Sequence, residues 1–174
     1  MTLTRIRIMN RIFIFCITLL SPVGYNNQDV IGFPPDRSGY WENPPNIKVC
    51  DRDIPIEKVI HAVEWWKVRK HKFGYIMRSH CFSKKESGYI YITLPGQGFN
   101  FSKNLARTHV AKKDNSSFIV WAHIEVTDPH KKRLLEHEFG HALGWTHASI
   151  DNHIMHPSWQ RGGWVDKGLI RGGL

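Results

Sequence analysis

The spacing of three histidines restricts the fold of this 174-residue chain more than any other feature of its sequence. His137 and His141 lie four positions apart, so on a helix both imidazoles project from one face, a turn above each other. Gly144 permits a sharp turn at the end of that helix, and the turn would bring His147 back toward the first two histidines. A fold that carries this segment therefore needs a helix followed at once by a reversal of the chain.

Three converging imidazoles with one open coordination position are typical of a catalytic zinc ion, whereas a structural zinc ion has four protein ligands. Such an ion lowers the pKa of bound water from about 15.7 to about 7 and polarises the carbonyl group under attack. Glu138 lies beside the histidine face, where its carboxylate can take the proton of that water. We therefore predict Glu138 as the catalytic general base and three zinc ligands, His137, His141 and His147.

The same segment resembles the metzincin signature HExxHxxGxxH, which is followed by a methionine turn. Met155 matches that methionine, and the five residues from Met155 onward are similar to the matrixin pattern Met-Tyr-Pro-x-Tyr. The resemblance implies a zinc metallopeptidase, an endopeptidase that hydrolyses peptide bonds through a metal-activated water. It also implies a pocket for the side chain after the scissile bond, lined by Pro157, Ser158 and Trp159.

One catalytic Zn²⁺ is the expected cofactor. The structural zinc site of matrixins includes a His-x-Asp motif that this sequence lacks, and their calcium loop is not recognisable in it. Neither calcium nor a second zinc ion is therefore supported. The gluzincin class is excluded because it needs a glutamate ligand well downstream, and no glutamate follows Glu138.

Hydrophobic and aromatic patterns predict an α+β fold. Strands are expected near residues 47–50, 75–81, 89–94, 105–111 and 118–127, and helices over residues 55–74 and 128–144. The resemblance implies a zincin fold, with a twisted, mostly parallel five-stranded sheet, an antiparallel edge strand, a backing helix and an active-site helix. In that fold residues 105–111 form the edge strand, which would pair with a protein or peptide substrate in extended conformation.

The N-terminal residues predict export. A basic start with Arg5, Arg7 and Arg11 precedes an apolar run over residues 12–20, which is shorter than the roughly 20 residues of a membrane-spanning helix. Residues 1–24 are therefore interpreted as a signal peptide or a short membrane anchor of a secreted or extracytoplasmic protein. Residues 25–46 are rich in proline and predict a linker or short pro-segment, and residues 47–174 form the catalytic domain.

Removal of the signal peptide would leave Cys50 and Cys81 as the cysteines of the chain. In an oxidising compartment an even pair suggests one disulfide, which would stabilise the fold by roughly 3 kcal/mol, but two buried free thiols are equally compatible with the sequence. The strand order implied by the resemblance places the two cysteines on neighbouring strands and favours the disulfide.

The formal net charge of +9 does not point to a function. Residues 48–85 hold ten lysines and arginines against four acidic residues, so this stretch is a docking face for an acidic surface partner or a solubility face. No specific nucleic-acid binding is indicated, and a monomer is expected. Two alternatives remain beside the peptidase: a zinc amide hydrolase acting on a cell-wall polymer, and a non-catalytic binding protein that retains the fold. Glu138 argues against the binding protein, which needs no base beside zinc.

Overall fold

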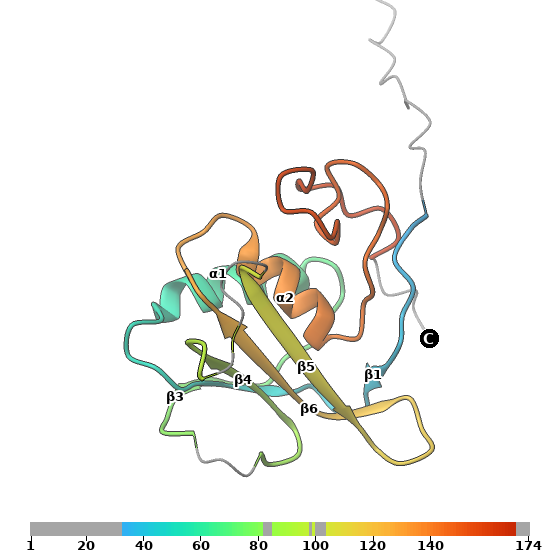
Figure 1. The fold of residues 1–174 in the computed structure, drawn as a ribbon. Coiled ribbons are helices and arrows are strands. Elements are labelled where there is room, and N and C mark those ends of the chain that lie inside the picture. The colour runs from blue at the N-terminus through green and yellow to red at the C-terminus, as the bar shows by residue number, and fades with distance from the viewer. Residues whose placement is uncertain (1–32, 82–84, 98, 100–103, 170–174) are drawn as a thin grey trace, which may run out of the picture.

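A mostly parallel sheet and two helices make up the computed structural model, which describes residues 33–81, 85–97, 99 and 104–169 (Figure 1). The predicted α+β class is confirmed at this level. In chain order the elements are β1 (Tyr40–Trp41), β2 (Asn46–Val49), α1 (Ile56–Lys67), β3 (Ile76–Arg78), β4 (Tyr89–Thr93), β5 (Ala106–Lys112), β6 (Phe118–Val126) and α2 (Leu134–Ala142).

The order of the main strands across the sheet is β3-β2-β4-β6-β5. Strands β3, β2, β4 and β6 are parallel, and β5 runs antiparallel to β6. The two-residue strand β1 pairs in parallel with the first residues of β6. Within the described part of the chain β5 has β6 as its one strand neighbour, so its outer backbone edge carries no strand.

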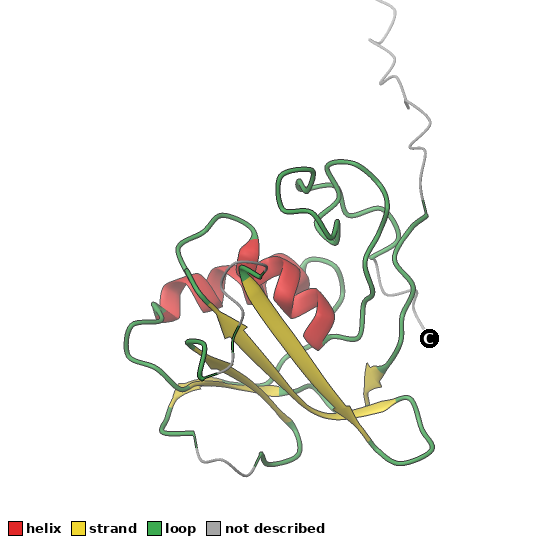
Figure 2. Ribbon diagram, viewed as in Figure 1, coloured by secondary structure: helices red, strands yellow, loops and turns green. Residues whose placement is uncertain are grey.

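Both helices cover the same face of the sheet, as Figure 2 shows. Alternation within the strands explains the core, because Ile47 and Val49 of β2 and Ile90 and Ile92 of β4 are fully buried. Helix α1 buries Val59, Ala62, Val63 and Trp66 against the rest of the core. The Trp66 indole Nε1 also donates a 2.8 Å hydrogen bond to the Glu136 carbonyl oxygen, which ties α1 to α2.

The predicted start of the second helix at Asp128 is wrong, because α2 begins at Leu134. Arg133 has a φ of 68°, a left-handed conformation that a right-handed helix cannot contain. The Asp128 carboxylate accepts a 2.9 Å hydrogen bond from the His130 backbone and so stabilises a turn. The first helix also ends earlier than predicted, at Lys67 and not near Gly74, and Lys70 is left-handed soon after it.

The predicted linker over residues 25–46 is part of the folded domain wherever the structure describes it, from residue 33 onward. Trp41 is buried, and its Nε1 donates a 2.8 Å hydrogen bond to the Ala142 carbonyl oxygen at the end of α2. The backbone N–H of Ser38 donates to the Gly144 carbonyl oxygen at 2.8 Å. The predicted signal peptide lies outside the described residues. None of the described helices is long and apolar enough to cross a membrane.

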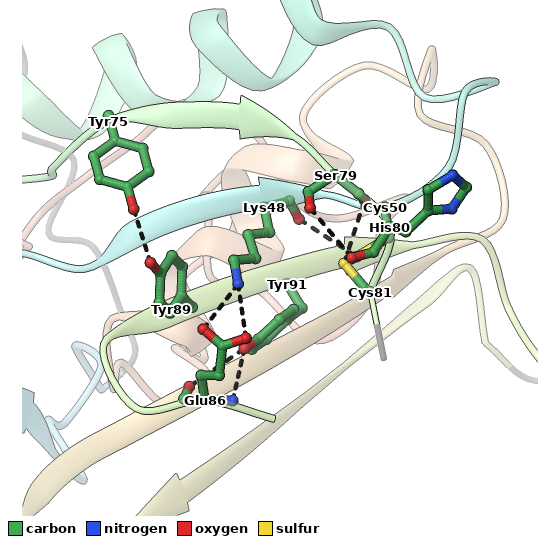
Figure 3. Close-up of polar contacts among 9 residues, drawn as sticks. All are labelled: Lys48, Cys50, Tyr75, Ser79, His80, Cys81, Glu86, Tyr89 and Tyr91. Atoms are coloured by element: carbon green, nitrogen blue, oxygen red, sulfur yellow. Dashed lines mark hydrogen bonds and ion pairs between the residues drawn. A yellow bond between two sulfur atoms is a disulfide. The ribbon is translucent and has the colours of Figure 1, made fainter. Parts of the chain in front are cut away.

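A disulfide joins Cys50, which follows β2, to Cys81 beyond the end of β3 (Figure 3). The two strands are parallel neighbours, which brings the Cα atoms of the cysteines to 5.3 Å. Of the two states compatible with the sequence, the structure contains the disulfide.

Candidate metal centre

Three histidine side chains converge, two from α2 and one from the segment that follows it. His137 and His141 project from one face of the helix, and their Nε2 atoms lie 3.0 Å apart. The chain then turns at Gly144, whose φ of 93° suits glycine, and the Nε2 of His147 comes to 3.1 Å from that of His141. Among the described residues this is the one group of three potential ligands that could hold a metal ion.

The hydrogen bonds of the Nδ1 atoms show which ring nitrogens of His137 and His141 face the centre of the group. His137 Nδ1 lies 2.7 Å from the Ile154 carbonyl oxygen, and His141 Nδ1 lies 2.8 Å from the Trp145 carbonyl oxygen. A carbonyl oxygen only accepts, so both Nδ1 atoms carry hydrogen and both Nε2 atoms of the neutral rings present lone pairs. Two facing lone pairs form no hydrogen bond with each other, and a cation between them satisfies both.

Two of the distances between the ring nitrogens fit a tetrahedral metal ion, and all three nitrogens lie within 4.8 Å of one another. Nitrogen ligands at about 2.0–2.1 Å from a zinc ion are about 3.3 Å from each other in tetrahedral geometry. The separations of 3.0 and 3.1 Å in the histidine group come close to that value. The backbone carbonyls behind His137 and His141 supply the outer hydrogen bonds that orient histidine ligands in metal sites.

Burial keeps these rings uncharged. Burial, together with a smaller effect of a neighbouring imidazole of the group, lowers the pKa of His137 to about 3 and that of His141 to about 4. The pKa of His147 is also lowered, first by burial and then by the charge of His156. All three imidazoles are therefore neutral at neutral pH, which is the form that binds a metal ion.

Glu138 lies beside the histidine group, on the buried side of α2. Its side chain is almost fully buried, and its Oε2 accepts a 2.5 Å hydrogen bond from the Thr108 hydroxyl of β5. Burial raises the pKa of Glu138 to about 7, although the hydrogen bond from Thr108 acts in the opposite direction. A carboxylate with this pKa can both take up and release a proton near neutral pH.

Met155 packs directly beneath the histidine-bearing helix. It is fully buried, and an alanine Cβ at Gly140 would overlap its Sδ. The backbone N–H of Ala148 donates to the Met155 carbonyl oxygen at 2.9 Å, which joins the segment after His147 to the methionine segment. The methionine therefore supports both parts of the chain that carry the histidines.

A cleft of about 880 Å³ passes over the three histidines and Glu138. One wall is formed by residues 104–108 and Val110, at the start and along the edge of β5. The opposite wall contains residues 156–160, which include the three residues predicted for the pocket, Pro157, Ser158 and Trp159. The structure thus places all of the predicted site residues except the disulfide and Met155 on one cleft.

Thr108 is a site residue that the sequence did not reveal. A threonine in a predicted edge strand is unremarkable, because the residue type suits any strand. Only the packing of β5 against α2 brings its hydroxyl to Glu138. The chain matches no protein-family model, and no curated protein is significantly similar to it.

Proposed function

We propose that the protein is a zinc-dependent endopeptidase of the metzincin type, similar to the matrixins. The observation that carries this proposal is the convergence of three Nε2 atoms beside a buried carboxylate, on a cleft at the sheet edge. A site that only stabilises the fold would be closed by a fourth protein ligand. The described residues offer three ligands, in a cleft open to larger molecules.

His137, His141 and His147 would hold the zinc ion. Imidazole nitrogens without thiolates suit zinc among the common biological metals, and the burial of these rings keeps them ready to bind. A zinc ion in such a site lowers the pKa of water and polarises a carbonyl group.

Glu138 would act as the general base and then as the general acid. Its carboxylate would take the proton from the attacking water and pass that proton to the amine of the departing peptide fragment. The raised pKa of about 7 supports both steps near neutral pH. A buried carboxylate with a pKa raised toward neutral is typical of a functional site, and this favours catalysis over simple metal storage.

The outer edge of β5 would bind the substrate backbone. An extended peptide would add to the sheet as a further strand, and its backbone would bond to the outer N–H and C=O groups of β5, which face no strand of the described residues. Side chains beyond the scissile bond would then meet Pro157, Ser158 and Trp159 on the opposite wall. This arrangement favours peptide substrates over the amide of a cell-wall polymer.

Export is part of the proposal. The disulfide between Cys50 and Cys81 supports an oxidising compartment, because disulfides of this kind are rare where thiols are kept reduced.

A degenerate peptide pool, analysed by mass spectrometry, tests the proposed function. The zinc-loaded protein should cleave internal bonds, a chelator should stop the cleavage, and added zinc should restore it. A His141→Ala variant should lose both zinc and activity, while His80→Ala, at an exposed histidine beside the disulfide, should keep both. The proposal would be overturned if protein that holds one zinc ion cleaves no peptide, or if cleavage continues unchanged in the presence of the chelator.

A further inference from the structure

The Glu138 carboxylate is held by a different element from the one that carries it. Its Oε2 accepts a 2.5 Å hydrogen bond from Thr108 Oγ1, and among the described residues this is its one side-chain partner. The same hydroxyl lies 3.3 Å from the Glu138 backbone carbonyl oxygen. Thr108 belongs to β5 and Glu138 to α2, so the contact joins the cleft wall to the helix.

The second carboxylate oxygen is left for another partner. Oε1 of Glu138 makes no hydrogen bond with the described residues. It is also not fully buried, since it is absent from the fully buried polar atoms of these residues that lack a hydrogen-bond partner. It therefore retains contact with the cleft, which Glu138 lines together with the three histidines. One oxygen is thus anchored on the protein and the other faces the space where a reacting molecule would lie.

Thr108 is well suited to this task. A β-branched side chain has few rotamers, and on a strand paired at every position its backbone is fixed as well. Thr108 pairs in register with Ile124, and the flanking pairs Arg107–Glu125 and His109–His123 point to the other face of the sheet because side chains alternate. The hydroxyl therefore reaches Glu138 from a rigid position.

We infer that Thr108 is a positioning residue, whose hydroxyl orients the Glu138 carboxylate toward the histidine group. This inference rests on the proposed function, since it assigns Glu138 the role of base. Misplacement of a catalytic group by about 1 Å can cost about 100-fold in rate. Loss of the Thr108 hydroxyl should therefore lower kcat by roughly 10- to 100-fold, while KM stays within about twofold because valine keeps the shape of the cleft wall and the β5 backbone is unchanged.

Three variants test the assignment in the zinc-loaded protein. Thr108→Val removes the hydroxyl at nearly equal volume and should show the loss in kcat. Thr108→Ser keeps the hydroxyl and should restore kcat to within a few-fold of wild type. Thr93→Val is the matched control, because it removes another strand hydroxyl, which bonds to His123 at 2.9 Å outside the cleft. This control should leave kcat and KM unchanged.

Crystal structures of the zinc-loaded wild type and Thr108→Val variant provide a readout independent of activity. The wild type should keep Oγ1 and Oε2 within about 3 Å, and the variant should show the carboxylate rotated or in several conformers around unchanged histidines. An unmoved carboxylate in the variant, unchanged kcat, or failure of Thr108→Ser to restore kcat would overturn the inference. If the wild type cleaves no peptide, the proposed function fails, and the carboxylate positions still decide the role of Thr108.

Discussion

Replacing Gly140 by alanine tests the packing that supports the metal centre. Gly140 lies on α2 between His137 and His141, with Met155 directly against it. An alanine Cβ would overlap the Met155 Sδ, and it would lie 2.8 Å from the Met155 Cε and 2.9 Å from the Trp66 Cζ2. Both neighbours are fully buried, and the Trp66 indole is held by its hydrogen bond to α2.

The expected effect is opposite to that in an exposed helix. In an exposed helix, a change from glycine to alanine raises the free energy of unfolding by about 1 kcal/mol. Overpacking of a filled core costs about 1–3 kcal/mol, and several atoms inside 3.0 Å place this site at the upper end. The net loss in the free energy of unfolding should therefore be about 2 kcal/mol, measured by urea denaturation of the metal-free protein. Zinc affinity should fall as well, because a shift of Met155 moves the neighbouring Ile154 carbonyl that orients His137.

The double variant Gly140→Ala/Met155→Ala is the control. Truncation of Met155 makes room for the new methyl group, so the double variant should be more stable than the sum of the two single changes by about 1–2 kcal/mol. A Gly140→Ala protein that is more stable than wild type, or strictly additive changes, would refute this description of the core beneath the histidines.

Three further predictions follow from the same structure. Gly144→Ala should destabilise the protein by at least about 3 kcal/mol in urea denaturation, because φ is 93° and the new Cβ would overlap the Gly39 carbonyl oxygen. The metal-free protein should lose stability as the pH falls from 6.5 to about 4.5. The pKa values of His137 and His141 are lowered in the folded state, so the unfolded chain binds more protons there, and each histidine contributes about 1.4 kcal/mol per pH unit. The raised pKa of Glu138 contributes about the same amount with the opposite sign, so a net loss of about 1.4 kcal/mol per pH unit remains. Stability that stays constant over this range would contradict the burial of neutral rings. Reduction of the disulfide, which closes a loop across 31 positions, should lower the free energy of unfolding by roughly 3 kcal/mol without loss of bound zinc.

Local patterns in the sequence predicted most of the fold. The strands found at β2, β4 and β6 are short apolar or alternating segments, and such patterns depend on neighbouring residues alone. The start of α2 was not predictable in this way, because the left-handed conformation of Arg133 is set by the chain around it. Strand β1 was not predicted for a similar reason. It consists of Tyr40 and Trp41 alone, too short for a pattern in the sequence, and it forms by pairing with β6.

In the candidate site, too, the features that depend on local sequence were predictable and those that depend on contacts between segments were not. The positions of His137, His141 and Glu138 follow from the helical repeat. Gly144 predicts the turn that brings His147 back toward them. The Ile154 carbonyl behind His137 and the Thr108 hydroxyl beside Glu138 come from other parts of the chain. Contacts between distant segments leave no spacing in the sequence, so only the structure reveals them.

The central claim is that Glu138 acts as a base beside a zinc ion held by His137, His141 and His147. Peptide turnover by the wild type and by Glu138→Gln, at equal zinc occupancy, tests it most directly. The two side chains have nearly the same volume, so the variant should bind one zinc ion and unfold at a similar urea concentration. Turnover should fall by at least about 100-fold, the usual contribution of a general base. Equal turnover by the two proteins would contradict the claim.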